Sequence, residues 1–255
     1  MDLGIKGKKA LVTGASRGLG RSIAGCLAKE GASVSLVARS HKDLGSFIEE
    51  YGDQHLVLSH DLMEKDAPGK MVRELLEKTG DPDIVVHNVG GTLDITDPFC
   101  SLKDWQKVYR FNLEIAVELN LLLIPHMQKQ KWGRVVHISS VAALENQGTV
   151  PYCSIKAALC AYTRSMGRFV SKDGINISAV LPGAVYTEGG YWDKTSRERP
   201  EHVETYLKER MAIQRFGNPD EIGEVVTFLC SEQASFIVGS NFLVDGGQGK
   251  CFIQN

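Results

Sequence analysis

The chain has 255 residues, of which 43% are hydrophobic, 24% charged and 7% aromatic, a globular profile that excludes disordered and collagen-like chains. Its 29 Lys and Arg against 31 Asp and Glu give a net charge of -2 without a long block of one sign, which argues against nucleic acid as the main partner. No apolar run approaches the roughly 18 residues that span a bilayer, and Met1 to Lys9 lack the apolar segment of a signal peptide. These features predict a soluble, cytoplasmic protein that binds no membrane.

The cysteines and histidines give no sign of a disulfide framework or a metal site. There is no C-x-x-C pair and no Cys/His spacing typical of zinc around Cys26, Cys100, Cys153, Cys160, Cys230 and Cys251. Reduced thiols are the usual state of such residues in a cytosolic protein. We therefore expect free cysteines and no bound metal.

Short runs rich in β-branched residues alternate with longer segments of helical period along the whole chain, with no linker, repeat or low-complexity stretch. The strands are expected at 10–13, 33–38, 55–59, 84–87, 135–139, 175–181 and 242–244. The helices are expected at 18–30, 43–51, 64–79, 102–131, 152–172 and 219–232. Strand–helix alternation predicts a seven-stranded parallel sheet flanked by helices, a doubly wound α/β fold of the Rossmann type, in one domain over residues 1–255.

A glycine-rich loop follows the first expected strand and leads into the first expected helix. It reads Thr13-Gly14-Ala15-Ser16-Arg17-Gly18-Leu19-Gly20. Glycines in this place let the backbone approach a pyrophosphate, and the free N–H groups of the helix start attract the anion. The loop predicts a nucleotide site, with a purely structural turn as the alternative.

The end of the second expected strand carries Ala38-Arg39-Ser40, where a site for NAD usually offers a carboxylate to the ribose 2′-hydroxyl. Arg39 and Arg17 can instead give forked, charge-assisted hydrogen bonds to a 2′-phosphate. This favours NADP(H) as the cofactor. The alternative is that both arginines are solvated surface residues.

Tyr152 and Lys156 lie four residues apart on the most regular expected helix, which places them on one face. Upstream, Ser139-Ser140 ends a buried strand, so their hydroxyls are expected at the carboxyl edge of the sheet, where ligands of open α/β folds bind. A Tyr and a Lys four residues apart are common by chance, and this pair points to function only because Ser139-Ser140 is expected at the same edge of the sheet.

Together these residues resemble the short-chain dehydrogenase/reductase family in its classical, single-domain form, over essentially the whole chain. Residues 13–20 resemble its cofactor loop, and 182–187 resemble the stretch that holds the nicotinamide carboxamide. His87-Asn88-Val89-Gly90 resembles its Asn-Asn-Ala-Gly element, with His87 and Val89 as departures and Gly91 as an extra glycine.

The resemblance assigns two sets of residues. The implied catalytic tetrad is Asn112, Ser140, Tyr152 and Lys156. The cofactor would contact Gly14, Ser16, Arg17, Gly18, Leu19, Gly20, Arg39, Ser40, Asp61, Leu62, Asn88, Gly90, Tyr152, Lys156, Pro182, Gly183, Val185 and Thr187.

The resemblance also implies a mechanism for interconverting a ketone and a secondary alcohol. Tyr152 would give or take the proton, Lys156 would lower its pKa toward neutrality, Ser140 would bind the substrate oxygen and Asn112 would hold a water that links Lys156 to solvent. Three alternatives remain open. Tyr152 and Lys156 could be a core aromatic and a surface lysine, Asn112 a polar residue at a bend, and Ser139 rather than Ser140 the catalytic hydroxyl.

Residues 188–215 break the strand–helix rhythm, and we expect them to form a lid over the substrate, with one short helix at about 201–210. The expected substrate contacts are Tyr186, Glu188, Tyr191 and Trp192. Aromatic and acidic groups suit a sugar or polyol, although a solvated loop would look the same.

Two enzyme readings follow from the resemblance: a reductase of a small or polyhydroxylated carbonyl compound, and a 3-oxoacyl-[acyl-carrier-protein] reductase. Lys129, Lys131 and Lys172 fall near positions where the carrier-dependent enzymes present basic residues, although solvated helix ends explain them too. A catalytically silent nucleotide sensor is the third reading. The family usually forms homotetramers or homodimers through the long helices at 102–131 and 152–172 and through the last helix and strand, and we expect the same here.

Overall fold

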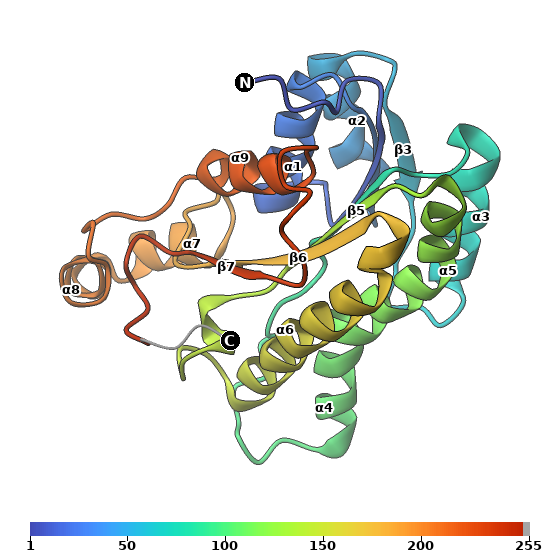
Figure 1. The fold of residues 1–255 in the computed structure, drawn as a ribbon. Helices are drawn as coiled ribbons and strands as arrows, with labels where there is room; N and C mark the ends of the chain where they lie inside the picture. The colour runs from blue at the N-terminus through green and yellow to red at the C-terminus, as the bar shows by residue number, and fades with distance from the viewer. Residues whose placement is uncertain (252–255) are drawn as a thin grey trace.

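The computed structural model describes residues 1–251, and within 41–43 it describes the backbone alone. A seven-stranded sheet in the order β3-β2-β1-β4-β5-β6-β7 forms its centre (Figure 1). The strands are β1 Lys9–Thr13, β2 Ser33–Ala38, β3 Leu56–Ser59, β4 Ile84–His87, β5 Gly133–Ile138, β6 Ile175–Pro182 and β7 Asn241–Val244. Every neighbouring pair is parallel, so the predicted doubly wound fold is confirmed.

The strand order reverses between β1 and β4. From β1 the chain builds outward through β2 and β3, then crosses back to place β4 on the other side of β1, where Val12 pairs with both Leu36 and Val86. The loops that leave β1 and β4 therefore diverge at the carboxyl edge of the sheet. Such a switch point opens a crevice at this edge, where ligands of the fold class bind.

Three helices cover one face of the sheet: α1 Gly18–Lys29, α2 His41–Tyr51 and α9 Pro219–Leu229 (Figure 1). Ile23 of α1, Phe47 of α2 and Val226 of α9 are fully buried in a single cluster with the side chains of β1 and β2. The apolar runs of the strands are thus explained, because both faces of the sheet are covered.

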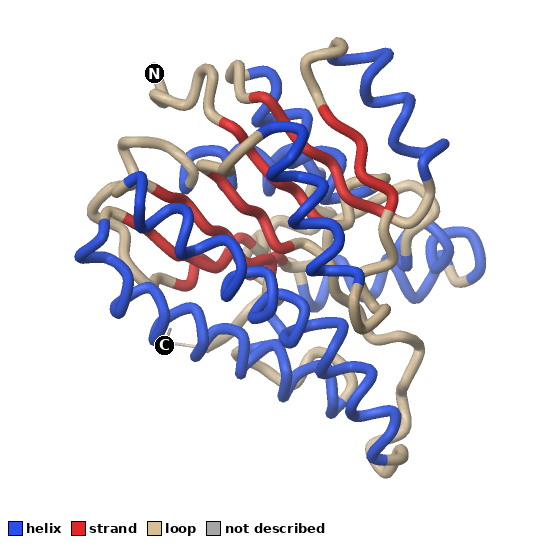
Figure 2. The backbone as a smooth tube through the Cα atoms, turned by 90° about the vertical axis from the view of Figure 1, so that its right-hand side faces the viewer, coloured by secondary structure: helices blue, strands red, loops and turns tan. Residues whose placement is uncertain are grey.

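The opposite face carries α3 Ala67–Thr79, α5 Ile115–Gln130 and α6 Val150–Val170, with α4 Leu102–Tyr109 extending beyond the sheet (Figure 2). Met71 of α3, Leu119 of α5 and Val170 of α6 share a second buried cluster with Leu11 and Val85. Short 3-10 turns follow β5 at Val141–Ala143 and α6 at Ser171–Asp173. No helix within residues 1–251 has the length and apolar character needed to cross a membrane.

Two expected helices differ from the structure. The single helix expected at 102–131 is interrupted by a π turn at Arg110–Glu114, which separates α4 from α5. The lid holds two helices, α7 Tyr191–Glu198 and α8 Pro200–Arg210, where one was expected. Period alone missed α7 because it is short and polar, and its fold depends on the tertiary contacts of Asp193 described below. Ser139, expected inside a strand, lies just after β5.

Candidate active site

A cleft of about 780 Å³ opens at the carboxyl ends of β1, β4, β5 and β6. It gathers most residues that the sequence singled out: Gly14, Ser16, Arg17, Gly18, Leu19, Arg39, Ser40, Asp61, Leu62, Asn88, Gly90, Ser140, Tyr152, Lys156, Pro182, Gly183, Val185, Thr187, Glu188 and Trp192. These residues come from segments spread over more than half the chain. The switch point of the sheet is what brings them together.

The floor of the cleft beside α1 is the glycine loop. Gly14 has φ +66 and Gly18 has φ +57, backbone angles that favour glycine. Asn88 fastens this loop to β4, because its Nδ2 donates to the carbonyl oxygen of Gly14 at 3.1 Å and its backbone N–H donates to Thr13 Oγ1 at 3.0 Å. The N–H groups at the start of α1 are thereby presented to the cleft, as pyrophosphate binding requires.

Gly20 does not line the cleft but packs α1 against the loop. A Cβ atom there would lie 2.2 Å from the carbonyl oxygen of Gly14 and 2.6 Å from Asn88 Nδ2. Glycine at this position lets the helix approach the strand end closely. Gly90 has a comparable constraint, since its Cβ would meet Asn112 Oδ1 at 2.8 Å and Lys156 Nζ at 2.9 Å.

The outer end of the cleft carries Arg17 and Arg39, both exposed. Ser40 lies next to them, and the acidic residues that line the cleft, Asp61 and Glu188, come from other segments than the end of β2. Positive charge without an adjoining carboxylate at the β2 end fits a phosphorylated ribose better than a free 2′-hydroxyl.

At the inner end, Lys156 is buried, and its Nζ donates to the carbonyl oxygen of Ile138 at 2.8 Å. The same Nζ lies 5.6 Å from the ring centroid of Tyr152. Burial lowers the pKa of Lys156 to about 8. The ammonium is therefore fixed beneath the cleft and still mostly charged at neutral pH.

Burial is the largest influence on the pKa of Tyr152 in the chain alone, and the acidifying role of Lys156 stays a prediction. Burial raises the pKa of Tyr152, and a hydrogen bond with Ser140 opposes that rise only in part. Lys156 Nζ donates its hydrogen bond to Ile138 and lies 5.6 Å from the centroid of the Tyr152 ring. Because burial raises its pKa, Tyr152 holds its proton at neutral pH.

The structure separates the roles of the two serines. Ser139 is buried, donates to the carbonyl oxygen of Lys156 at 3.2 Å and contacts Cys160 Sγ at 3.3 Å. Ser140 lies beside Tyr152, and its Oγ also accepts the N–H of Ala142 at 3.2 Å. Ser140 is thus the hydroxyl directed to Tyr152, while Ser139 braces α6.

Asn112 lies in the π turn, buried, and does not line the cleft. Its Nδ2 donates to the carbonyl oxygens of Gly91 at 2.8 Å and Val108 at 2.9 Å, and its Oδ1 accepts the N–H of Gly91 at 2.9 Å. Both amide hydrogens are therefore already used. The Asn112 side chain fixes the Gly90–Gly91 loop against Lys156. This role is more specific than that of a polar residue tolerated at a bend.

Comparison with known proteins identifies the family of this chain. The family model described as Enoyl-(Acyl carrier protein) reductase matches residues 14–248. The 3-oxoacyl-[acyl-carrier-protein] reductase of Aquifex aeolicus is 34% identical over 252 residues, which cover 97% of this chain and 99% of that protein. The chain belongs to the short-chain dehydrogenase/reductase family. The resemblance given by its motifs is confirmed.

Solved structures of short-chain dehydrogenase/reductases share the fold over nearly the full length. L-sorbose reductase from Gluconobacter frateurii, complexed with NADPH and L-sorbose, has a TM-score of 0.92 and 32% identity and covers 99% of this chain and 100% of its own. A 3-oxoacyl (acyl-carrier-protein) reductase from Agrobacterium tumefaciens with NADP bound has a TM-score of 0.89 and 30% identity, covering 96% and 95%. The chain is therefore an oxidoreductase of this family.

Beneath the cleft of this short-chain dehydrogenase/reductase lies a buried polar network that sequence reasoning missed. His87 Nε2 contacts Asn120 Oδ1 at 2.8 Å, and Asn120 Nδ2 contacts His137 Nε2 at 3.1 Å and donates to Tyr162 Oη at 3.1 Å. His137 Nδ1 contacts Thr163 Oγ1 at 2.8 Å. In the sequence, His87 was notable only as a departure from a family motif. A further signal for the network was His137, because it pairs with His87 across β4 and β5.

The lid of this short-chain dehydrogenase/reductase is held by the buried carboxylate of Asp193. It accepts hydrogen bonds from Tyr186 Oη at 2.6 Å, from the N–H of Gly189 at 2.8 Å and from Arg197 Nε at 3.1 Å. These donors hold the pKa of Asp193 well below its usual range, with the Arg197 hydrogen bonds as the largest cause. The predicted substrate residue Tyr186 is thus committed to the lid and does not line the cleft.

Of the other predicted lid contacts, Glu188 and Trp192 line the cleft and Tyr191 does not. Tyr191 is 64% exposed. Trp192 packs on Tyr206 with ring centroids 4.3 Å apart and on Phe216 at 4.8 Å. An aromatic cluster therefore covers the cleft, and Trp192 is the member of the cluster that lines it.

Proposed function

We propose that this protein is an NADPH-dependent oxidoreductase that interconverts a ketone and a secondary alcohol, with Tyr152 as the general acid and base. The observation that carries the proposal is the convergence of Ser140, Tyr152 and Lys156 at the inner end of a cleft whose outer end carries Arg17 and Arg39. One end suits proton transfer to an oxygen, and the other suits a phosphorylated dinucleotide.

The residues that would hold the cofactor line one continuous wall. The glycine loop would take the pyrophosphate, Arg17 and Arg39 the 2′-phosphate, and Asp61 and Leu62 the adenine side. The backbone of Gly90 and the Pro182–Thr187 stretch would border the nicotinamide. When bound, NADP(H) supplies the hydride donor or acceptor and, in its oxidised form, a positive ring. The NADPH and NADP complexes of the two solved relatives support this choice.

The chain's own residues would handle the oxygen and its proton. Ser140 donates a hydrogen bond to the substrate carbonyl, which favours the negative charge that develops on that oxygen. Tyr152 keeps its proton at neutral pH because burial raises its pKa, so it is ready to donate in the reductive direction. Lys156, 5.6 Å from the ring, would stabilise the resulting phenolate by about 3 kcal/mol at an effective dielectric of 20.

For the substrate, we propose a small carbonyl compound, with a polyhydroxylated one favoured. The structural support is Trp192 together with Glu188 on the lid side of the cleft, an apolar face next to a hydrogen-bond acceptor. L-sorbose in the related reductase is consistent with this choice. The lid would close the cleft to water during turnover.

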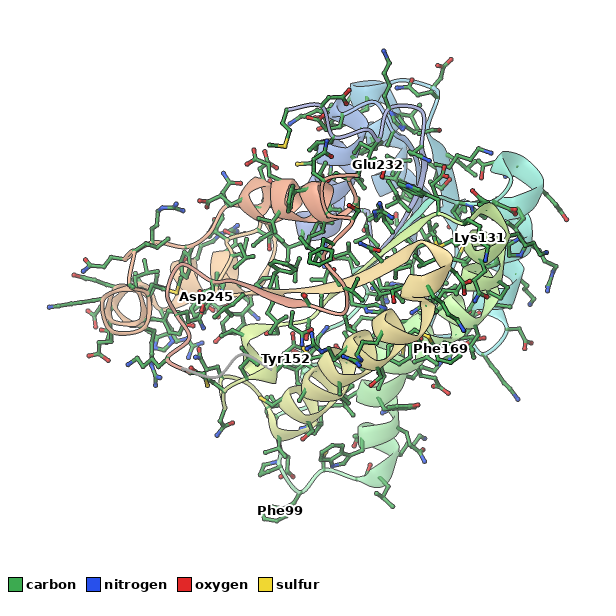
Figure 3. The ribbon with its side chains drawn as sticks, in the orientation of Figure 1. Phe99, Lys131, Tyr152, Phe169, Glu232 and Asp245 are labelled. Atoms are coloured by element: carbon green, nitrogen blue, oxygen red, sulfur yellow. The ribbon has the colours of Figure 1, made fainter. Side chains whose placement is uncertain are left out.

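A 3-oxoacyl thioester is the second candidate, supported by the 3-oxoacyl-[acyl-carrier-protein] reductases among the relatives. Within one chain, the positions of the basic residues Lys131 and Lys172 do not support this second candidate. Lys131 precedes β5 and Lys172 precedes β6, at the amino edge of the sheet, while Tyr152 lies beyond the carboxyl edge (Figure 3). Lys131 is also paired with Asp173 at 2.9 Å.

The experiment is a substrate panel with NADPH oxidation as the readout. Ketoses and simple ketones turned over faster than acetoacetyl thioesters would support the first candidate, and the reverse order would support the second. Tyr152→Phe should abolish turnover of every active substrate. Equal rates in this variant would remove the proposed mechanism and leave the nucleotide-sensing alternative.

We further propose that the protein works as a homotetramer or homodimer. The stretch 119–124 of α5 is divided: Leu119, Leu123 and Ile124 are buried, whereas Leu121 is 65% and Leu122 37% exposed. Phe169 on the neighbouring α6 is 68% exposed (Figure 3). An apolar face on adjacent helices supports a helix-to-helix contact between copies, and sedimentation would give the number of chains.

A further inference from the structure

Gln248, in the segment after β7, is 4% exposed and has its amide group fully engaged. Its Oε1 accepts the N–H of Ala184 at 2.7 Å. Its Nε2 donates to Tyr206 Oη at 2.8 Å and to Gln147 Oε1 at 2.5 Å. One side chain thus joins three parts of the molecule that are far apart in sequence.

None of these three partners lines the cleft, but each lies in a segment that adjoins lining residues or packs on one of them. Ala184 follows Pro182 and Gly183, which line the cleft after β6. Gln147 lies in the loop between Ser140 and Tyr152. Tyr206 is on lid helix α8 and packs on Trp192, whose ring lines the cleft.

The position of Gln248 is itself fixed. Its backbone N–H donates to the carbonyl oxygen of Asp245 at 3.2 Å, and the next N–H, of Gly249, donates to Asp245 Oδ2 at 2.6 Å. Beyond it, the N–H of Lys250 bonds to Glu145 in the loop that holds Gln147. Asp245 lies on the side of the molecule where α8 lies (Figures 1 and 3). Gln248 is therefore a fixed point against which the lid helix can be held.

The chemistry requires an amide at this position. Ala184 offers a donor, so its partner must accept, while Gln147 offers the carbonyl oxygen of its side chain, so its partner must donate. Glutamine provides both groups at one end of a flexible stem. Gly183 leaves room for it, because a Cβ there would lie 2.7 Å from Gln248 Oε1.

We propose that Gln248 is a positioning residue that sets the closed placement of lid helices α7 and α8 over the substrate end of the cleft, acting through Tyr206 and Trp192. It also ties that placement to the Pro182–Ala184 loop that borders the cofactor. The part of this inference that concerns turnover rests on the proposed reductase function. The part that concerns lid placement does not.

The test compares Gln248→Met, which keeps the length of the side chain and removes its hydrogen bonds, with the native protein. Hydrogen exchange should become about tenfold or more faster in the amides of α7 and α8 and stay unchanged in α1 and α5. In steady-state assays, KM for the ketone should rise about tenfold while the Kd of NADPH stays within about twofold. Gln233→Met is the matched control, since Gln233 is exposed, bonds to the backbone of Asp2 and does not line the cleft.

Tyr206→Phe removes the hydrogen bond between Gln248 and lid helix α8, and it is the variant to use if Gln248→Met does not fold. It should increase exchange in α7 and α8 without affecting the loop at 182–184. Exchange in the lid that equals that of the native protein in a folded variant would overturn the proposal. If no ketone is reduced by the native protein, the proposed function fails while the exchange measurement still decides the role of Gln248.

Discussion

The imidazole rings of His87 and His137 stack beneath the active-site cleft, with centroids 5.0 Å apart and ring planes inclined at 27°. Thr163 donates its hydroxyl to the carbonyl of Leu159, so it accepts from His137 Nδ1, and His137 Nε2 in turn accepts from Asn120. Asn120 Oδ1 then accepts from His87 Nε2. The chain of hydrogen bonds therefore requires a neutral His137 and a hydrogen on His87 Nε2, and burial lowers the pKa of His87 to about 4 and that of His137 well below its usual value.

We predict that this pair makes the protein acid-sensitive. Between pH 6.5 and about 4 the unfolded chain binds a proton at His87 that the folded chain rejects, so stability is fully present above pH 6.5 and is lost as the pH falls. The loss is about 1.4 kcal/mol per pH unit for each such imidazole, or about 3 kcal/mol for His87 over the window. Urea unfolding at a series of pH values measures it.

His87→Asn should flatten that dependence, because an asparagine has no proton to bind. His202→Asn, at an exposed site on α8, is the control and should leave the slope as it is. An unchanged slope in His87→Asn would show that the ring titrates in the folded protein as it does in the unfolded chain.

Lys156 and Tyr152 give a second prediction. Lys156→Met removes the ammonium that lies 5.6 Å from the Tyr152 ring, so kcat should fall by about 100-fold if about 3 kcal/mol of phenolate stabilisation is lost. Because burial holds the pKa of Lys156 at about 8, activity in the native protein should decline above that pH as the ammonium is lost. The measurement is the pH profile of kcat in the two proteins. If kcat of Lys156→Met declines at the same pH as kcat of the native protein, another group causes the decline.

The outline of the fold could be predicted from the sequence because local patterns of apolar and polar residues indicate it. The runs at β2 and β4 are mostly apolar and their ends agree with the expected ones, since strands covered on both faces carry that signature. The π turn at Arg110–Glu114 could not be predicted, because the helical spacing of apolar residues continues through it. Its cause is tertiary, in that Asn112 reaches across to Gly91.

The site was predictable to a similar limit. Motif order placed Ser140, Tyr152 and Lys156 in one cleft, but the orientation of Lys156 toward Ile138 depends on the depth of burial, which spacing does not report. The same holds for Asp193, whose role depends on Tyr186 and Arg197 being folded around it. Gln248 carries no local signal, because its three partners lie 42 to 101 residues away.

The third prediction concerns cofactor choice. Arg39→Ala should weaken NADPH binding by about 10- to 100-fold, the loss expected when a charge-assisted hydrogen bond worth roughly 1.5 to 3 kcal/mol is removed. NADH binding should change little, because the exposed guanidinium has no phosphate to contact there. Fluorescence titration with each nucleotide measures both constants. Lys29→Ala, an exposed cation outside the cleft on α1, controls for the general loss of positive charge, and a parallel loss of NADH affinity in Arg39→Ala would argue against a 2′-phosphate contact.

The fourth prediction tests the close approach of α1 to the glycine loop. Gly20→Ala places a methyl group 2.2 Å from the carbonyl oxygen of Gly14 and 2.6 Å from Asn88 Nδ2, so the helix or the loop has to move. We expect a destabilisation of about 1 to 3 kcal/mol, as for overpacked cores, and a cofactor affinity at least tenfold weaker. Gly45→Ala in α2 is the matched control, since its Cβ meets no atom of the described side chains or backbone within 4 Å and alanine favours a helix by up to about 1 kcal/mol. Opposite signs of the change in unfolding free energy are therefore expected for the two variants in urea titrations, and a Gly20→Ala protein that unfolds like the native one would mean that the loop and α1 are not packed as described.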